Sequence, residues 1–104
     1  MTTIHNKLVR DLIPEIIQSS GKTCVTRRLS DEEYLAALDA KLTEELAEYQ
    51  ADKSMEELAD LLEVMMAVAE ARGHTFAVVE AIRKEKADKR GGFRERIFLE
   101  SVDA

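Results

Sequence analysis

The chain contains few of the residues that usually constrain or interrupt a fold. Of its 104 residues, one is cysteine, one is proline and four are glycine. Because Cys24 is the only cysteine, a disulfide within the chain is excluded, and a reducing compartment is expected. No linker or low-complexity tract interrupts the pattern, so we expect residues 1–104 to form a single domain with one modest core.

Long hydrophobic runs and an excess of basic charge are also absent. No apolar segment approaches the length that crosses a bilayer, and the N-terminus lacks the apolar stretch of a signal peptide. We therefore expect a soluble, cytoplasmic protein with no membrane partner. The formal net charge of −6 argues against a nucleic-acid partner, because nucleic-acid-binding domains are usually basic.

Several familiar ligand motifs are missing. There is no glycine-rich phosphate loop and no dinucleotide fingerprint, so a phosphate site would have to be of another kind. His5 and His74 are isolated, and Cys24 has no partner at ligand spacing, which argues against zinc. The Glu-x-x-His pairs of di-iron bundles do not occur either.

What the sequence does contain is helical patterning. Ser30 and Ser54 are each followed three residues later by a glutamate, the capping-box pattern that begins a helix. An earlier, short helix has Asp11 as a plausible cap and Gly21 as a plausible stop. The predicted helices cover about residues 8–19, 31–50, 55–72 and 75–89, with an extended connector or short strand over 23–29 and a strand-like tail around 97–99.

The two central helices are expected to lie antiparallel. Their connection around Lys53 is only a few residues long, which favours neighbouring helices that fold back on each other. The apolar residues between Leu58 and Ala69 form an arc wide enough to be covered on more than one side. We therefore predict an all-α fold, in which an antiparallel helical hairpin with flanking helices assembles into a helical bundle on oligomerisation.

Two pairs of carboxylates stand at i,i+3 spacing on the predicted hairpin. Glu45 and Glu48 precede the connection, and Glu57 and Asp60 follow it. Helical phasing puts both pairs beside the apolar stripes, about one turn from the connection, so that their carboxylates can converge. The same phasing directs Glu44 almost to the opposite side of its helix, and it directs Glu56 and Glu63 away from the group.

Two interpretations of these carboxylates are open. A close carboxylate cluster repels itself unless a cation lies within it, and ligands that are all carboxylate oxygens suit Mg²⁺ or Mn²⁺. The alternative is a solvated acidic face, since acidic residues such as Glu57 are favoured in the first turn of a helix. Glu45 and Glu48 are harder to explain in that way, because they approach a helix C-terminus, where negative charge is unfavourable.

Basic side chains gather at the end of the last helix, before Gly91-Gly92. Lys86, Lys89 and Arg90 are favoured there by the helix dipole alone. The functional alternative is that they bind phosphate oxygens. Lys7 and Arg10, near the N-terminus, form a smaller polar cluster with the same two interpretations.

Together these motifs resemble a known superfamily. Glu44-Glu45-x-x-Glu48 followed by Glu56-Glu57-x-x-Asp60 is similar to the acidic signature of the MazG-like, all-α nucleoside triphosphate pyrophosphohydrolases. The opening segment from Asn6 to Pro14 and the closing segment from Lys89 to Phe93 resemble a small, single-domain branch of that superfamily.

The resemblance implies a Mg²⁺-dependent enzyme that hydrolyses a nucleoside triphosphate to the monophosphate and pyrophosphate, and that works as a homodimer or homotetramer. Carried over residue by residue, the metal ligands are Glu45, Glu48, Glu57 and Asp60. Glu44, Glu45 and Glu48 form the catalytic set, one member of which would instead orient or deprotonate the attacking water. The expected phosphate contacts are Lys86, Lys89 and Arg90, with Lys7 and Arg10 as further candidates.

Two other functions stay open at the level of sequence. Phosphoribosyl-ATP pyrophosphohydrolases have a similar helical fold and similar acidic residues. A non-catalytic nucleotide-binding or regulatory interaction module is the alternative from another class.

Overall fold

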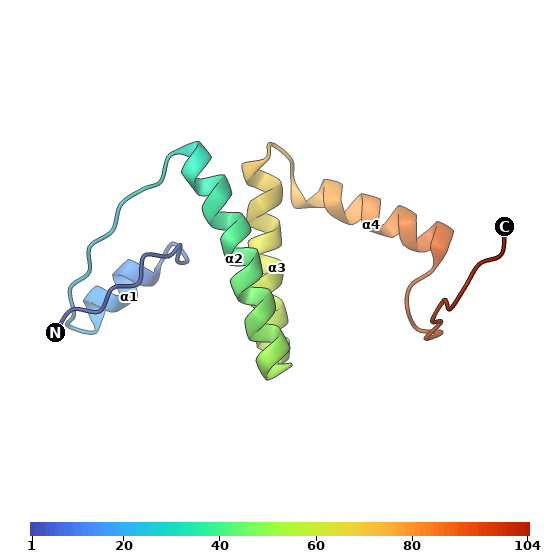
Figure 1. The fold of residues 1–104 in the computed structure, drawn as a ribbon. Helices are drawn as coiled ribbons and strands as arrows, with labels where there is room; N and C mark the ends of the chain where they lie inside the picture. The colour runs from blue at the N-terminus through green and yellow to red at the C-terminus, as the bar shows by residue number, and fades with distance from the viewer.

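The computed structural model describes residues 1–104 and contains four helices and no strand (Figure 1). The predicted all-α class is therefore confirmed. None of the helices combines the length and the apolar character that a membrane span requires. The helices are α1 (Ile13–Ser19), α2 (Asp31–Asp52), α3 (Met55–Ala71) and α4 (Phe76–Arg90).

The two central helices begin at the serines that the sequence indicated. The Ser30 hydroxyl accepts a hydrogen bond from the Glu33 N–H at 3.2 Å, and the Glu33 carboxylate accepts one from the Ser30 N–H at 3.1 Å. At the start of α3, the Ser54 hydroxyl accepts from the Glu57 N–H at 3.2 Å, so the serine half of the box forms there. Such caps stabilise a helix by about 1 kcal/mol, and they fix the residue from which each helix is phased.

The start of α1 differs from the prediction. The helix begins at Ile13 rather than near Leu8, and its N-cap is Leu12, with no side-chain hydrogen bond. The predicted cap at Asp11 was therefore wrong. Pro14 explains the later start, because a proline is tolerated only in the first turn of a helix.

The two regions with strand-like sequence also form no strand. Residues 23–29 are irregular, as the connector alternative predicted. The strand-like character expected around 97–99 does not appear, and that prediction was wrong. These segments have no neighbouring strand to pair with, and β-branched residues alone do not form a ladder.

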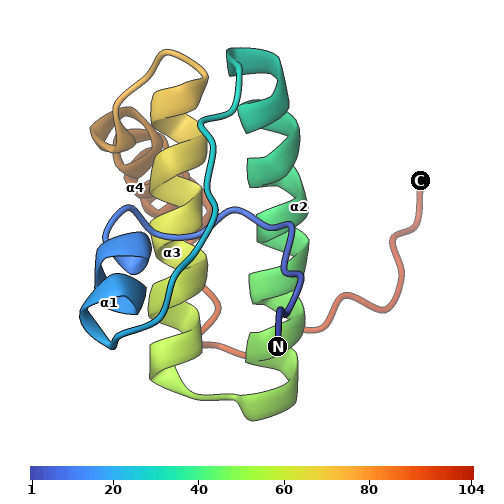
Figure 2. The same ribbon diagram turned by 90° about the vertical axis from the view of Figure 1, so that its left-hand side faces the viewer.

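Helices α2 and α3 form the antiparallel hairpin (Figures 1 and 2). Lys53 turns the chain between them in a left-handed conformation with φ 59°. Only four residues of the chain are buried, all of them in the hairpin: Leu38, Glu45, Val64 and Ala69. The core is therefore one thin seam, and a carboxylate lies within it.

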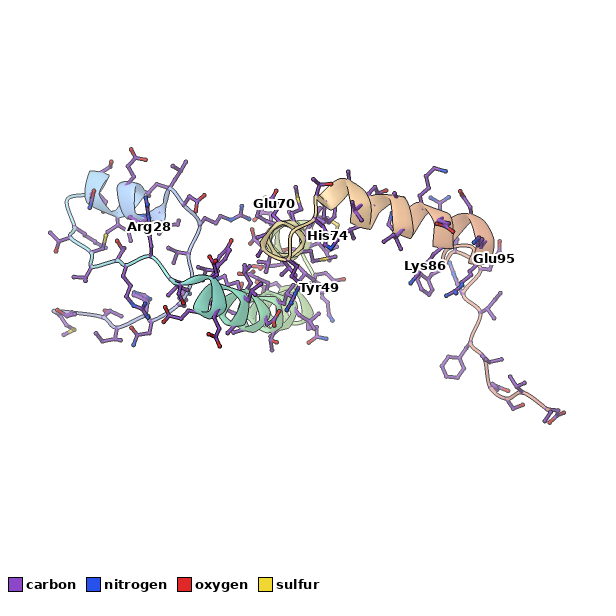
Figure 3. The ribbon with its side chains drawn as sticks, turned by 90° about the horizontal axis from the view of Figure 1, so that it is seen from above. Arg28, Tyr49, Glu70, His74, Lys86 and Glu95 are labelled. Carbon is purple, nitrogen blue, oxygen red and sulfur yellow. The ribbon has the colours of Figure 1, made fainter.

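The flanking helices lie on opposite sides of the hairpin (Figures 1 and 3). On one side are α1 and the N-terminal segment. On the other side α4 leaves the end of α3 and projects away from it, with no buried residue along its length. The radius of gyration is 18.5 Å, compared with about 13 Å for a compact domain of this length.

Candidate metal centre

Carboxylates from both helices of the hairpin gather at one place. Oxygen atoms of Glu44, Glu45 and Glu48 lie within 4.8 Å of one another, and oxygens of Glu45, Glu57 and Asp60 form a second group of the same size. Glu45 belongs to both groups, so the two groups make one acidic cluster. The predicted convergence of the two acid pairs is therefore observed.

The centre of the acidic cluster is buried and short of hydrogen-bond donors. Glu45 is 7% exposed and is the one charged residue among the buried four. Its Oε2 atom and the Oε2 atom of Glu57 are both buried without a hydrogen-bond partner. A buried polar atom without a partner costs about 1–3 kcal/mol, and more when the group is charged. These unpartnered oxygens, in a set of oxygen donors only, fit a hard divalent cation such as Mg²⁺ or Mn²⁺.

The pKa values of Glu45 and Glu57 reflect the same shortage of nearby positive charge. Burial raises the pKa of Glu45, and the adjacent Glu48 carboxyl raises it further. Burial also raises the pKa of Glu57, with additional repulsion from Glu48, Asp52 and Asp60. Glu48 is exposed, yet its charge acts on both Glu45 and Glu57. A cation between the three carboxylates would reduce the repulsion among them.

Glu44 is not directed away from the cluster, contrary to the prediction from helical phasing. Its Oε1 lies 3.3 Å from Lys41 Nζ and 3.5 Å from Lys7 Nζ. Burial disfavours the charged form of Glu44, but the two ammonium groups outweigh it and its pKa lies below the ordinary value. Phasing fixes only the Cα–Cβ direction, and the flexible glutamate side chain then follows the lysines.

Lys41 is a site residue that the sequence analysis missed. Its ammonium group also lies 3.4 Å from Glu45 Oε1, and its side chain is only 16% exposed. The spacing in the sequence could have indicated it. Lys41 lies three residues before Glu44 and four residues before Glu45, and helical side chains at these spacings are neighbours. Lys41 is therefore the nearest built-in counter-charge of the buried carboxylate.

The N-terminal basic residues lie against the acidic cluster. Arg10 Nη2 is 2.8 Å from Asp60 Oδ1, and Arg10 Nη1 is 3.7 Å from Glu63 Oε1. Lys7 reaches Glu44, as described above. The structure thus brings these two candidate phosphate contacts to the edge of the acids, and it brings Glu63 beside Arg10.

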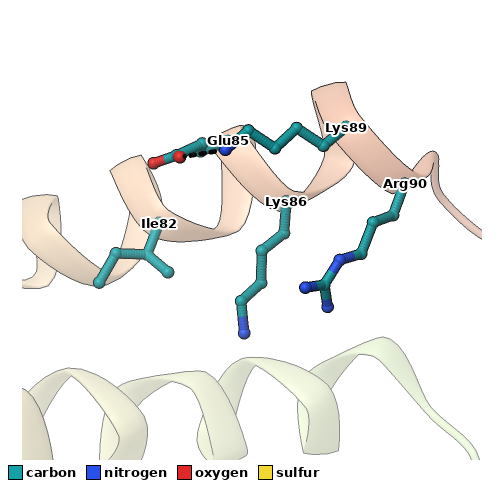
Figure 4. Close-up of a pocket in the computed structure, with 5 residues that line it drawn as sticks. All are labelled: Ile82, Glu85, Lys86, Lys89 and Arg90. Atoms are coloured by element: carbon teal, nitrogen blue, oxygen red, sulfur yellow. Dashed lines mark hydrogen bonds and ion pairs between the residues drawn. The ribbon is translucent and has the colours of Figure 1, made fainter.

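The structure does not bring the basic residues of α4 to the acids of the same chain. Lys89 pairs with Glu85 at 2.9 Å. Lys86 and Arg90 make no ion pair, and their side chains project from the same side of α4 (Figure 4). Together with Ile82, these four residues line a shallow hollow of about 210 Å³. A role for Lys86, Lys89 and Arg90 at phosphate stays a prediction.

No protein-family model matches the chain, and no solved structure matches it. The chain is similar to an uncharacterized protein of Mycolicibacterium smegmatis, with 67% identity over 45 residues. The matched residues are 43% of this chain and 46% of that protein, so the match spans less than half of the relative.

Proposed function

We propose that the chain is a Mg²⁺-dependent nucleoside triphosphate pyrophosphohydrolase, with Mn²⁺ able to replace Mg²⁺. The observation that supports this best is the acidic cluster across α2 and α3, with its two buried, unpartnered carboxylate oxygens. The resemblance to MazG-like enzymes supplies the triphosphate substrate, which the acids alone do not indicate. Assembly into a homodimer or homotetramer belongs to the same proposal.

Each member of the acidic cluster has a role suited to its surroundings. Glu45 and Glu57 supply the buried oxygens, the exposed Glu48 adds oxygens from α2, and the half-buried Asp60 adds oxygens from α3, so the four can hold one cation from several directions. A Mg²⁺ ion held there supplies charge neutralisation at the phosphate oxygens and lowers the pKa of a nearby water. Glu44 remains ionised beside Lys41 and lies at the edge of this group, where it can orient the attacking water.

The basic side chains at the N-terminus serve the leaving group. A triphosphate is strongly anionic, and a protein with a net charge of −6 repels it unless positive charge is concentrated at the site. Lys7 and Arg10 already lie at the edge of the acidic cluster, 3.5 Å and 2.8 Å from their carboxylate partners. When phosphate oxygens replace those partners, the two cations stabilise the charge that builds on pyrophosphate.

The test is a substrate panel in the presence of Mg²⁺. Standard and damaged nucleoside triphosphates, together with phosphoribosyl-ATP, are incubated with the folded protein, and pyrophosphate and the monophosphate product are measured. We expect turnover of at least one nucleoside triphosphate and its loss on chelation of the metal. Turnover of phosphoribosyl-ATP alone supports the closest enzymatic alternative. Nucleotide binding without hydrolysis of any substrate contradicts the proposal and supports a non-catalytic module.

A further inference from the structure

The N-terminal segment lies across the acidic cluster. Residues 7–10 run from α2 to α3 over one side of the hairpin, with Lys7 at Glu44 (Figure 2). At the other end of this short stretch, Arg10 Nη2 is 2.8 Å from Asp60 Oδ1. Asp60 is also one of the carboxylates whose oxygens lie within 4.8 Å of one another. Arg10 therefore pairs with a carboxylate that the proposed metal site needs.

The N-terminal segment is held to the hairpin mainly by side chains. Of residues 1–12, only Leu8 is half-buried, and all the others are exposed. No backbone hydrogen bond joins this segment to the hairpin, and α1, which follows it, makes no close backbone approach to another helix. A segment with so few packed neighbours rearranges at little cost in free energy. The ion pairs of Lys7 and Arg10 therefore decide where the segment lies.

Lys41 is a cation of a different kind at the same cluster. It lies 3.3 Å from Glu44 and 3.4 Å from Glu45, and its side chain is only 16% exposed. Because Lys41 is part of α2, its position is fixed by the helix that also carries its partners. The Arg10 side chain is 56% exposed and belongs to a segment with no regular structure. Arg10 can therefore leave Asp60 without any change in the hairpin.

Glu63 gives Arg10 a second partner outside the cluster. Arg10 Nη1 is 3.7 Å from Glu63 Oε1. Glu63 follows Asp60 by three residues, so the two side chains are neighbours on the surface of α3, but Glu63 belongs to neither carboxylate group. A guanidinium has five N–H donors in one plane. Arg10 can therefore release Asp60, remain paired with Glu63 and keep free donors at the edge of the cluster.

We propose that Arg10 exchanges partners when Mg²⁺ binds. Arg10 gives up the Asp60 carboxylate to the metal, stays paired with Glu63, and binds a phosphate oxygen of the triphosphate with the freed N–H groups. Two positive charges at the acidic cluster weaken its attraction for Arg10, so the phosphate site forms only after the metal binds. Glu63 is a positioning residue, because it acts through Arg10. The phosphate step rests on the proposed function, whereas the exchange requires only the metal site.

Arg10→Gln should change two affinities in opposite directions. The variant lacks the competitor for Asp60, so Mg²⁺ alone should bind about twofold to fivefold more tightly, the range expected for the loss of an exposed ion pair. A non-hydrolysable triphosphate in saturating Mg²⁺ should bind more weakly than to the native chain. Isothermal titration calorimetry measures both affinities. Arg10→Gln that binds Mg²⁺ no more tightly than the native chain overturns the proposal.

Arg72→Gln is the matched control for this substitution. The Arg72 side chain is 52% exposed, close to the value for Arg10, and it pairs with Asp39 at 3.5 Å. It lies twelve residues after Asp60, near the other end of the hairpin. Both affinities should stay at their native values in Arg72→Gln. If Arg72→Gln tightens Mg²⁺ binding as much as Arg10→Gln does, the effect comes from net charge alone and the proposal is overturned.

The Arg10 guanidinium can also be observed directly in the native chain. In protein with isotope-labelled arginine, the side-chain N–H signals of Arg10 are those missing from the NMR spectrum of Arg10→Gln. These signals should move as Mg²⁺ is added, because Arg10 loses its contact with Asp60, and the signals of Arg72 should stay in place. Signals of Arg10 that do not change up to saturation with Mg²⁺ overturn the exchange.

Glu63→Gln tests the second partner. It removes the carboxylate that keeps Arg10 at the edge of the site but leaves Arg10 to compete for Asp60. Mg²⁺ alone should therefore bind no more tightly than to the native chain, whereas the triphosphate should bind more weakly. Glu70→Gln, at an exposed position on the same helix, should leave both affinities unchanged. Native triphosphate affinity in Glu63→Gln overturns the role of Glu63.

The two levels of the proposal can fail separately. A native chain that binds no triphosphate contradicts the proposed function. If Arg10→Gln still tightens Mg²⁺ binding in that case, the exchange at Asp60 is supported and only the phosphate step is lost.

Discussion

Glu45 is the residue around which the electrostatics of the chain are organised. It is buried, it belongs to both carboxylate groups, and Lys41 is its nearest cation. Its position was predictable, because Ser30 fixes the start of α2 and therefore the phase of every residue after it. The direction of the Glu44 side chain was not predictable, because it depends on rotamers and on Lys7, which is distant in sequence.

Glu48→Gln should weaken Mg²⁺ binding by about tenfold or more, which corresponds to at least about 1.4 kcal/mol. The substitution removes the charge that acts on both Glu45 and Glu57. Because Glu48 is exposed on α2, the helical content should not change. Calorimetric titration and circular dichroism measure the two effects. Glu56→Gln is the matched control, since it removes an equal charge outside the acidic cluster, and equal Mg²⁺ affinity in both variants would exclude Glu48 as a ligand.

Glu33 should make the stability of the protein depend on pH in acid. Its hydrogen bond with Arg27, followed by the one with the Ser30 N–H, lowers the pKa of Glu33 to about 2. This pKa lies below the value of about 4.3 for a glutamate in the unfolded chain. The contribution of Glu33 to the free energy of unfolding is therefore complete above about pH 4.3 and is lost as the pH falls towards 2. Urea unfolding should show Glu33→Gln to be less stable than the native chain at neutral pH, with a difference that shrinks in this range.

Glu32→Gln is the control for that experiment. Glu32 is a neighbouring exposed acid in the first turn of α2, but it takes no part in the capping box. Glu32→Gln should leave the free energy of unfolding at neutral pH close to that of the native chain. The difference in unfolding free energy between Glu33→Gln and the native chain could instead stay constant down to pH 2. That result would show that the capping box does not depend on the charge of Glu33.

At the scale of the helix, local signals predicted what local interactions decide. α2 and α3 begin after the two serines because each cap is made within four residues. α1 was placed too early, since the proline in its first turn prevails over the polar residue before it. The direction of α4 could not be predicted from local signals. It depends on the turn after α3 and on what packs against the apolar face of α4.

Magnesium should stabilise the helical hairpin, and the effect should be lost in mild acid. A cation that binds only the folded hairpin at a concentration 100 times its Kd adds about 2.7 kcal/mol. The raised pKa values of Glu45 and Glu57 mean that these carboxyls take up protons at a higher pH than ordinary glutamates. The gain in Tm on adding Mg²⁺ should therefore begin to fall at a pH above the ordinary glutamate pKa of about 4.3.

Thermal unfolding across a pH series, with and without Mg²⁺, measures this effect. Sodium chloride at matched ionic strength is the control for general screening of the acids. Without Mg²⁺, Glu45 and Glu57 should make the protein more stable as the pH falls through this range. The reason is that a group with a raised pKa in the folded state adds stability as it takes up its proton. A gain in Tm that is equal in sodium chloride would contradict a specific cation site.

At the scale of the whole molecule, the single chain is open. Four buried residues are few for a domain of 104, which is consistent with the proposed assembly into a homo-oligomer. The wide apolar arc on α3 predicted that more than one neighbour covers it. Which flank stays uncovered was not predictable from composition, because it follows from the side on which the N-terminal segment and α1 lie.

The Tm should therefore depend on the concentration of the protein. When folding and association are coupled, dilution favours the unfolded chain by mass action. Scanning calorimetry over a hundredfold range of concentration should show the Tm rising with concentration for the native chain. Leu62 is a large apolar side chain on α3 that is 44% exposed. Leu62→Glu places a charge there, so this variant should have a lower Tm that no longer varies with concentration. A native Tm that is independent of concentration would contradict the coupling of folding and association.

The divergence of α4 from its own hairpin has a consequence for limited proteolysis. No residue of α4 is buried, and a helix with few packed neighbours opens locally at little cost in free energy. A protease at low concentration should therefore cut the free chain within α4 first and leave the hairpin of α2 and α3 intact.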